Sequence, residues 1–168
     1  EVKIIDESGN EKSTGEVGEI LVRGETVMRG YWNRPEETAE TLTPDGWLKT
    51  GDLGHLDEKN RLFISAGRIK DLIIRAGENI SPLAIENALM NHPAIAEVAA
   101  VGVPDERAGE RVKVCVVLRQ ETAATENELK KFCRENLPAF MTPDTFQFME
   151  ALPKTATGKI LKTELKGN

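Results

Sequence analysis

The sequence predicts an α+β fold, in which a small β-rich, barrel-like segment is followed by a compact C-terminal domain of about three strands packed with helices. Two patterns, and the change between them, support this prediction. Residues 1–66 read as short strands separated by tight turns, with little helix. After Lys70 the chain alternates strands with helices, and the pentapeptide at residues 67–71 separates the two patterns. We therefore expect one domain to include residues 1–68 and a second to include residues 69–168.

The first part contains residues that favour turns and one short helix. A helix is expected at residues 33–42, because Pro35 suits a first helical turn and the acidic Glu36 and Glu37 suit the positive N-terminal end of a helix. The sequence Pro-Asp-Gly at residues 44–46 favours a turn, since Pro fixes φ and Gly tolerates a positive φ. The strands that we expect in this part cover residues 2–6, 19–23, 47–56 and 61–65.

Capping residues indicate the helices of the second part. Ser81 is a good N-cap, with Pro82 at the first helical position. Thr125 and Glu128 have the spacing of a capping box for another helix. Cys133 lies on the apolar stripe of that helix, so we expect it in the core rather than as a reactive thiol. The expected strands cover residues 71–75, 97–103, 112–118 and 145–149, and a short terminal helix is expected at residues 160–166.

Composition and charge are typical of a soluble globular protein. Hydrophobic residues make up 39% and charged residues 30% of the chain, and no apolar run approaches the roughly 20 residues that a membrane helix needs. The net charge of −6 argues against nucleic acid as a partner. Cys115 and Cys133 show no pairing pattern, and with only His55 and His92 elsewhere no Cys/His metal site is expected. We expect reduced thiols in a cytoplasmic protein.

Residues 153–160 suggest a phosphate-binding P-loop at first sight. That pattern needs Ser or Thr after the Gly-Lys pair, and Ile160 follows Lys159 here. It also needs Gly five residues before Gly158, where this chain has Pro153. What remains is a lysine on a hydroxyl-rich turn with a glycine, which offers a point charge suited to phosphate. The alternative is a plain surface turn that happens to contain a lysine.

Two further residues have side chains that suit a nucleotide. Asp52 follows Gly51 within the strand expected at residues 47–56, and a carboxylate there can accept two hydroxyl hydrogen bonds, as from a ribose diol. The alternative is an aspartate that accepts hydrogen bonds from the amides of a turn. Arg68 follows a glycine and could pair with phosphate or sugar, or form an ordinary ion pair.

Five segments taken together are more specific than any of these residues alone. Residues 30–36 read Gly-Tyr-Trp-Asn-Arg-Pro-Glu, residues 46–53 read Gly-Trp-Leu-Lys-Thr-Gly-Asp-Leu, and residues 67–71 read Gly-Arg-Ile-Lys-Asp. Residues 77–82, Gly-Glu-Asn-Ile-Ser-Pro, with Ile85-Glu86 shortly after them, and the run at residues 153–159 follow. The series resembles the C-terminal third of an adenylate-forming (AMP-binding) enzyme, over nearly the whole chain. That family includes acyl-CoA synthetases, firefly-type luciferases and the adenylation domains of peptide synthetases.

The resemblance implies a role for each residue that matches a family motif. Asp52 would hold the ribose hydroxyls of ATP and then of the acyl-adenylate, and Arg68 would make a second contact to the nucleotide. Lys159 would be the catalytic lysine, which enters the site for adenylation and stabilises charge on the phosphate and carboxylate oxygens. Lys70 would be the hinge about which residues 69–168, as a mobile lid, rotate between two half-reactions. The turn that contains Gly77, Glu78 and Asn79 would line the channel for the pantetheine arm of CoA.

The resemblance also implies substrates and partners. Residues 71–82 resemble fatty- and other carboxylic-acid–CoA ligases, so we expect ATP with Mg²⁺, CoA and a carboxylic acid, most simply a fatty acid, as substrates. Residues 1–68 would be the C-terminal end of a large N-terminal AMP-binding domain, and the rest of that domain would be the partner within the same polypeptide. Open strand edges in this part also predict self-association, for instance as a homodimer. No bound metal is expected within the chain.

Two departures from the family pattern leave other interpretations of the function open. The phosphate loop and the segments that hold adenine and acid in the family have no counterpart here, and Lys70 stands where many relatives have Asp. Because the sequence also has no initiator Met and opens inside an expected strand, we expect a fragment that is inactive in isolation. The alternatives are a stand-alone, non-catalytic binding or interaction module with the lid fold, and an adenylation domain that serves a carrier protein.

Overall fold

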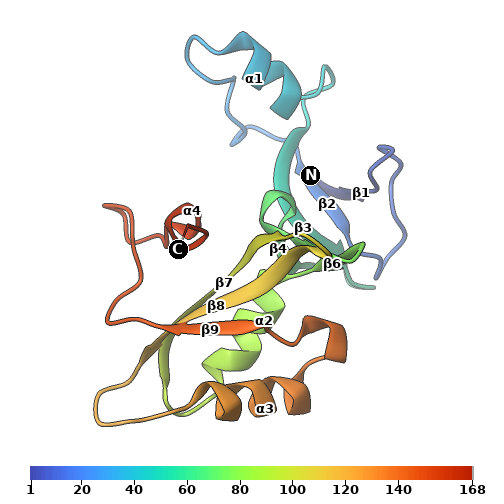
Figure 1. Ribbon diagram of the computed structural model, residues 1–168. Coiled ribbons are helices and arrows are strands. Elements are labelled where there is room, and N and C mark those ends of the chain that lie inside the picture. Colours follow the sequence, from blue (N-terminus) through green and yellow to red (C-terminus); the bar gives the residue numbers. More distant parts are fainter. Residues whose placement is uncertain (168) are drawn as a thin grey trace. The chain divides into compact units, whose positions relative to one another are not determined.

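The computed structural model describes residues 1–167, with Ala66 described by its backbone alone. The chain forms two compact units, Glu1–Lys70 and Asp71–Asn168 (Figure 1). Each unit is built around its own β-sheet, and helices accompany both sheets. The predicted α+β class is therefore confirmed.

The first unit is an antiparallel sheet whose four strands follow one another in sequence order. Its strands are β1 (Val2–Ile5), β2 (Gly18–Val22), β3 (Leu48–Leu56) and β4 (Leu62–Arg68). Each lies within about two residues of its predicted position, except that β4 continues three residues further, to Arg68. That extension matters, because it brings Arg68 into register with β3.

A single helix and one tryptophan complete the first unit. Helix α1 (Pro35–Thr41) begins at the predicted proline and carries Glu36 and Glu37 in its first turn. Trp47 is buried, 7% exposed, and packs with Ile5 and Leu21. Its ring is also covered by two cations, because the Lys3 Nζ lies 4.4 Å and the Arg23 Cζ 4.6 Å from the ring centroid. Cation–π contacts of this kind are favourable at a site that is partly open to water.

The second unit contains a five-stranded sheet. Its strands are β5 (Ile73–Arg75), β6 (Glu78–Ile80), β7 (Ile95–Asp105), β8 (Gly109–Leu118) and β9 (Thr145–Phe148). The order is β6-β5-β8-β7, and β9 pairs with β8 in parallel. The other helical elements are α2 (Pro82–Met90), α3 (Glu126–Asn136), α4 (Lys162–Leu165) and the 3₁₀ turns η1 (Ile69–Asp71) and η2 (Ala139–Met141).

The structure corrects the predicted strands of this unit in two places. Strands were expected at four ranges of this unit, and the sheet has a fifth, because the polar Glu78 and Asn79, which were expected to form a turn, form β6 and pair with β5. The strand expected to stop before Pro104 continues as β7 to Asp105. Proline is accommodated there because β7 lies at the edge of the sheet, where a missing N–H group leaves no partner strand unsatisfied.

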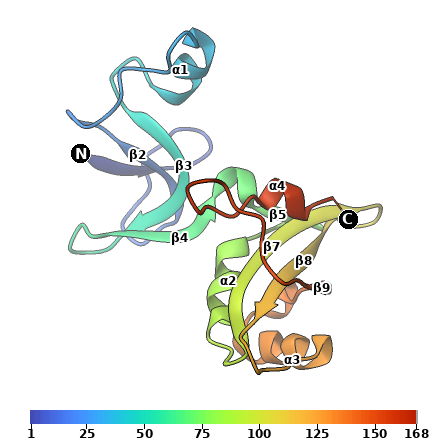
Figure 2. The same ribbon diagram turned by 90° about the vertical axis from the view of Figure 1, so that its left-hand side faces the viewer.

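Both faces of this sheet are covered, and successive residues of β7 alternate between them as strand geometry requires (Figures 1 and 2). Val98 and Ala100 join the core under α2 and α3, which is formed by Ile85, Leu89, Leu129 and Cys133 together with β8. Ala99 and Val101 join the opposite core under the C-terminal segment, together with Cys115, Leu152 and Leu165. The predicted core position of Cys133 is confirmed.

The predicted helix caps of this unit are also confirmed. The Ser81 side chain accepts a hydrogen bond from the Ala84 N–H group, with Pro82 at the first helical position. Thr125 and Glu128 exchange both hydrogen bonds of a capping box, with distances of 3.3 Å and 2.7 Å. These local signals can be read from sequence because the partners lie within one turn of each other.

Candidate functional site

Asp52 and Arg68 lie opposite each other on β3 and β4 of the first unit. The Arg68 Nε lies 3.3 Å from the Asp52 Oδ1, and the Arg68 Nη2 donates to the Thr50 carbonyl at 3.2 Å. Both side chains remain open to water, with 49% of Arg68 and 38% of Asp52 exposed. The structure therefore brings the two predicted nucleotide contacts together, on a surface where a ligand could reach either of them.

Glycines and a shift of register create this pairing. Gly51 and Gly67 both have φ above +70°, a backbone conformation that favours glycine. Between Leu53 and Gly54 the register with β4 shifts, which is the geometry of a β-bulge and turns the strand locally. At Gly54 an added Cβ would lie 2.4 Å from the Phe63 carbonyl oxygen, so the two strands approach as closely as glycine allows. Bulges of this kind re-aim side chains beside functional sites.

Lys70 is the last residue of the first unit and lies in the 3₁₀ turn η1, with its side chain exposed. The turn, Ile69–Asp71, follows β4 directly and ends on Asp71, the first residue of the second unit. The predicted hinge therefore coincides with the point at which one compact unit gives way to the next. Its role as a hinge stays a prediction.

Gly77 forms a two-residue hairpin turn with Ala76 between β5 and β6. Ala76 has φ of 52° and Gly77 has φ of 85°, so both central residues are in the left-handed region, as in a type I′ turn. The Ala76 N–H group donates to the Ala108 carbonyl at 2.8 Å. Glu78 and Asn79 follow with exposed side chains. The turn predicted to line the CoA channel is thus a defined, exposed β-turn.

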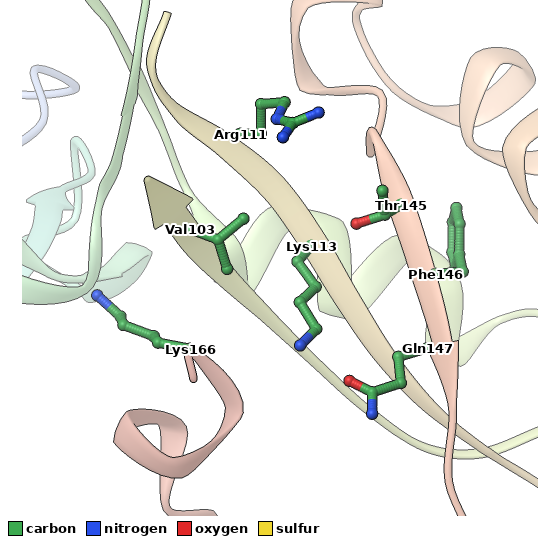
Figure 3. Close-up of a pocket in the computed structure, with 7 residues that line it drawn as sticks. All are labelled: Val103, Arg111, Lys113, Thr145, Phe146, Gln147 and Lys166. Carbon is green, nitrogen blue, oxygen red and sulfur yellow. The ribbon is translucent and has the colours of Figure 1, made fainter. Parts of the chain in front are cut away.

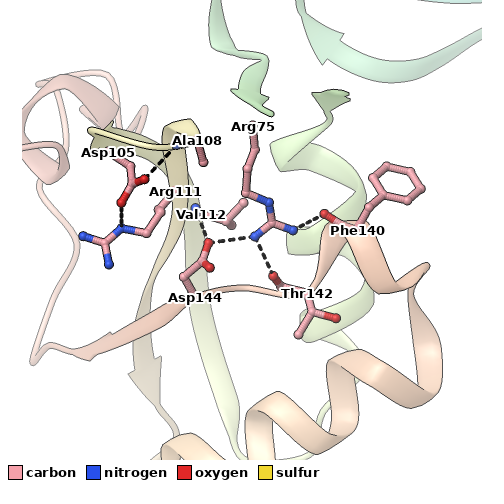
Figure 4. Close-up of polar contacts among 8 residues, drawn as sticks. All are labelled: Arg75, Asp105, Ala108, Arg111, Val112, Phe140, Thr142 and Asp144. Carbon is pink, nitrogen blue, oxygen red and sulfur yellow. Dashed lines mark hydrogen bonds and ion pairs between the residues drawn. The ribbon is translucent and has the colours of Figure 1, made fainter. Parts of the chain in front are cut away.

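Arg75 fixes this hairpin to the rest of the second unit (Figure 4). Its Nη1 lies 2.7 Å from the Asp144 Oδ2 and 3.1 Å from the Thr142 carbonyl, and its Nη2 donates to the Phe140 carbonyl. The same Asp144 oxygen accepts the Val112 N–H group at 2.8 Å. This network could not be predicted from the sequence, because its members come from segments more than 30 residues apart.

A second polar cluster stabilises the β7–β8 connection next to the hairpin. The Asp105 Oδ1 accepts the N–H groups of Ala108 at 2.9 Å and Arg107 at 3.0 Å, and the Arg111 Nε lies 2.7 Å from the other carboxylate oxygen (Figure 4). The backbone hydrogen bonds, chiefly from Ala108, lower the pKa of the Asp105 carboxyl below its ordinary value. The carboxylate therefore keeps its charge well into the acid range.

Lys159 projects from a compact turn with internal hydrogen bonds. The Thr155 N–H group donates to the Lys159 carbonyl at 2.8 Å, and the Gly158 N–H group donates to the Thr155 carbonyl at 2.9 Å. Gly158 has φ of 84°, and the hydroxyl groups of Thr155 and Thr157 lie 2.9 Å apart. The Lys159 side chain is exposed. A positive charge is thus presented at the surface by a turn whose backbone is well defined.

The structure also contains a basic cavity of about 490 Å³ on the face of the sheet that carries α4 (Figure 3). The cationic side chains at its wall are Arg111, Lys113 and Lys166, with Thr145 and Gln147 beside them. The Lys113 Nζ donates to the Leu165 carbonyl at 3.1 Å, and Arg111 forms an ion pair with Asp105. The contact between Lys113 and Leu165 ties α4 to β8.

The two cysteines, Cys115 and Cys133, are free and buried. Burial raises the pKa of the Cys115 thiol and raises that of Cys133 to about 11, so both stay protonated at neutral pH. Among residues 1–167, no group of three or more His, Cys, Asp and Glu side chains is arranged to hold a metal ion. Within the same residues, no helix is long and apolar enough to cross a membrane.

Two family models match the chain. Residues 1–32 match the AMP-binding enzyme model, and residues 84–159 match the AMP-binding enzyme C-terminal domain model. Asp52, Arg68, Lys70 and the Gly77 turn lie between the two matched ranges, whereas Lys159 is the last residue of the second.

Curated relatives align with nearly all of the chain. A long-chain-fatty-acid–CoA ligase of Bacillus subtilis (strain 168) is 48% identical over 95% of this chain and 28% of its own length. A sulfoacetate–CoA ligase of Cupriavidus necator is 42% identical over 97% of this chain and 32% of its own length. The fatty acid–[acyl-carrier-protein] ligase ScoC of Streptomyces coeruleorubidus is 43% identical over 98% of this chain and 31% of its own length. The chain thus spans less than a third of the length of these relatives.

A solved structure of a related enzyme has the same fold over nearly all of the chain. The ATP-bound MatB of Rhodopseudomonas palustris superposes with a TM-score of 0.92, at 35% identity, over 99% of this chain and 33% of that protein. The order of the two family models agrees with the predicted resemblance, with the AMP-binding match first and the C-terminal domain second. The chain therefore belongs to the adenylate-forming (AMP-binding) enzyme family and corresponds to the C-terminal portion of such an enzyme.

Proposed function

We propose that this chain is the C-terminal part of an ATP-dependent acid–CoA ligase. The enzyme would activate a carboxylic acid as acyl-AMP and then transfer the acyl group to CoA. The observation that carries the proposal is that two ligases whose names include CoA align with at least 95% of the chain. The remainder of the AMP-binding domain, in the same polypeptide, would supply the partner surface.

In the first half-reaction a carboxylate oxygen of the acid attacks the α-phosphorus of ATP, and diphosphate leaves. Asp52 would accept hydrogen bonds from the ribose hydroxyls, and Arg68 would turn from Asp52 toward the nucleotide. Lys159 would place its charge against the phosphate and carboxylate oxygens as negative charge develops on them. Its exposed position at the end of a well-defined turn supports this role, since a fixed charge stabilises a transition state without reorganising during the reaction.

In the second half-reaction the sulfur of CoA attacks the acyl carbon, and AMP leaves. This step needs different groups around the adenylate, and one rigid arrangement would serve both transition states poorly. Rotation of the second unit about Lys70 would withdraw Lys159 and bring in the Gly77 turn, whose backbone, with Glu78 and Asn79, would line the channel for CoA. The position of Lys70 at the end of the first compact unit supports its role as the hinge.

The choice of substrates has unequal support. ATP is supported by the ATP-bound MatB structure, and Mg²⁺ would enter with the phosphates of ATP. A fatty acid is favoured by the 48% identical relative from Bacillus subtilis, whereas the sulfoacetate ligase shows that the acid varies among relatives of similar identity. We propose a fatty acid and a cytoplasmic enzyme, where its free cysteines would stay reduced.

A carrier protein is the second candidate for the acyl acceptor. It is favoured by the 43% identity to ScoC, which is named for transfer of a fatty acid to an acyl carrier protein. Both acceptors could present a thiol to the same acyl-adenylate. The two candidates therefore differ in the last step only.

A competition between acceptors tests the proposal. The full-length polypeptide that carries this chain should catalyse ATP–diphosphate exchange that depends on a fatty acid, and should form acyl-CoA faster than acyl-carrier protein when both acceptors are present. The 168-residue chain alone should give no exchange. Failure of the full-length polypeptide to exchange label with any carboxylic acid would contradict the proposal, and a preference for the carrier protein would favour the second candidate.

A further inference from the structure

The residues that follow β9 form a C-terminal strap, defined here as residues 152–165, which crosses one face of the five-stranded sheet (Figure 2). Its two ends are anchored by apolar side chains, because Leu152 is 4% and Leu165 is 3% exposed against Ala99 and Cys115. Between these anchors Lys159 is exposed. The position of Lys159 therefore depends on how the two legs of the strap, meaning the residues before and after Lys159, are held.

The strap carries Lys159 as a small rigid unit rather than as a loose loop. Its legs pair through an antiparallel bridge between Lys154 and Ile160, and the Leu161 N–H group donates to the Pro153 carbonyl at 2.8 Å. Because the legs are hydrogen-bonded to each other, a shift of either leg moves the whole turn. A contact that fixes one leg to the rest of the unit consequently fixes Lys159.

Glu86 makes such a contact from the opposite face of the sheet. It lies on α2, and its Oε1 accepts the Ala100 N–H group of the edge strand β7 at 2.8 Å. The same oxygen lies 2.7 Å from the Nζ of Lys162, three residues after Lys159. One carboxylate therefore joins a helix on one face, the edge strand and the strap on the other face.

A second ion pair holds the other leg but is more open to water. The Lys154 Nζ lies 2.7 Å from the Glu97 Oε2, and these side chains are 40% and 37% exposed. In the pair formed by Lys162 and Glu86 the exposures are 25% and 16%. Exposed pairs contribute little because water screens them, whereas removing one partner of a largely buried pair leaves an uncompensated charge. Glu86 is therefore the stronger of the two attachments.

We propose that Glu86 is a positioning residue for Lys159, acting through Lys162. The inference rests on the adenylation role proposed above for Lys159. Glu86 touches no substrate in this scheme. It fixes the place from which the Lys159 charge is presented, and misplacing a reacting group by about 1 Å costs up to about 10²-fold in rate.

Hydrogen exchange of the 168-residue chain tests the positional part without any activity. In Glu86→Gln, whose amide oxygen can still accept the Ala100 N–H group, the backbone amides of Thr155, Gly158 and Leu161 should exchange about tenfold faster. Lys162→Met should have the same effect, and Lys162→Arg, which keeps the charge, should exchange like the unaltered chain. Lys131→Met, a matched change on the exposed face of α3, is the control.

The core amide of Val114 shows whether each variant is folded. If its exchange is unchanged and the amides of the strap are also unchanged in Glu86→Gln and Lys162→Met, the positioning inference is overturned. If the Val114 amide also exchanges faster in Glu86→Gln, that variant is not fully folded. Lys162→Met and the rescue by Lys162→Arg then decide the question, because both leave the hydrogen bond between Ala100 and Glu86 in place.

Kinetics of the full-length polypeptide test the functional part. Glu86→Gln and Lys162→Met should lower kcat for adenylation by about tenfold to a hundredfold, with little change in the KM for ATP. Thioester formation from supplied acyl-adenylate should change less than about twofold. The kcat for adenylation should fall no further in the double variant than in either single variant, because both changes break the same contact.

The two readouts separate the inference from the function on which it rests. Faster exchange in the strap with unchanged adenylation would confirm the positioning by Glu86 and overturn the role of Lys159. Unchanged exchange with slower adenylation would overturn the positioning and leave the role of Lys159 standing. An equal fall in the rates of both half-reactions, with unchanged exchange of the Val114 amide, would also overturn the inference. The strap would then affect both steps and not adenylation alone.

Discussion

Asp52 and Arg68 are direct cross-strand partners on β3 and β4, with 3.3 Å between the Arg68 Nε and the Asp52 Oδ1. An ion pair as exposed as this one contributes about 0–1 kcal/mol to stability. A ligand that binds either side chain would therefore lose little by breaking the pair.

Asp52→Asn should weaken nucleotide binding without unfolding the protein. The amide keeps one acceptor but loses the charge, so KM for ATP should rise by about tenfold, as expected for a hydrogen bond to a charged group worth ~1.5 kcal/mol. The midpoint of urea unfolding should hardly move. Glu37→Gln, which breaks the exposed pair of Glu37 with Arg34 on α1, is the matched control and should leave KM unchanged. An unaltered KM in Asp52→Asn would remove the ribose contact from the proposal.

Lys159→Ala should slow adenylation selectively in the full-length polypeptide. Loss of a fixed charge beside a developing charge costs on the order of 10²–10³ in rate, by analogy with removed oxyanion donors. ATP–diphosphate exchange measures this step, and thioester formation from synthetic acyl-adenylate measures the other. Lys131→Ala on the exposed face of α3 serves as the control. If both half-reactions slow equally, the model with two alternating states is wrong.

Lys70→Pro should slow thioester formation selectively and leave adenylation largely intact. Residues of a 3₁₀ turn such as η1 typically have φ of about −50 to −70°, close to the value of about −65° that proline fixes. The substitution should therefore fit this conformation and block rotation out of it. Adenylation should persist in the conformation that the ring permits, and acyl transfer to CoA should fall by at least about tenfold. Lys70→Ala removes the same side chain but leaves φ free, and should retain both steps. Equal loss in the alanine and proline variants would indicate that the side chain, rather than the hinge, matters.

Ala76→Asn should stabilise the second unit. Ala76 has φ of 52° at the first central position of the turn, a conformation that costs an alanine roughly 1 kcal/mol and that asparagine tolerates. The free energy of unfolding should therefore rise by up to about 1 kcal/mol in urea titrations. Asn60, which already adopts φ of 55° in the first unit, offers the converse control: Asn60→Ala should destabilise its own unit. A lower stability of Ala76→Asn would show that the Ala76 methyl group makes contacts that outweigh the strain.

The Cys133 thiol should make stability depend on pH in alkaline solution. Burial raises its pKa from the ordinary value of 9.0 to about 11, so the folded state holds the proton more tightly than the unfolded state. The contribution to stability is complete below pH 9 and is lost as the pH rises toward 11, because the unfolded state releases the proton first. Cys133→Ser should flatten this part of the pH profile. Alkylation by iodoacetamide at pH 8 should likewise be slow in the folded chain and fast in urea.

Features whose causes are local could be predicted from the amino-acid sequence. Ser81 and Pro82 begin α2, and Thr125 with Glu128 caps α3, since all four act within one helical turn. The family could also be recognised from sequence, because its motifs are contiguous runs of residues. The pairing of Asp52 with Arg68 was not predicted, although both residues were identified.

The way in which the predicted residues are held in place follows from the three-dimensional fold. Strand β6 has polar, turn-like residues and exists because β5 lies beside it, so neighbouring structure overrides local preference. Arg75 reaches Asp144 across 69 residues of sequence, and Glu86 reaches Lys162 across a sheet edge. No short pattern encodes such contacts, because a side chain's partner at long range is set by strand order and by the packing of helices on the sheet. The sequence therefore identified the residues proposed to act on the nucleotide and on CoA, and the fold decided which other residues hold them in place.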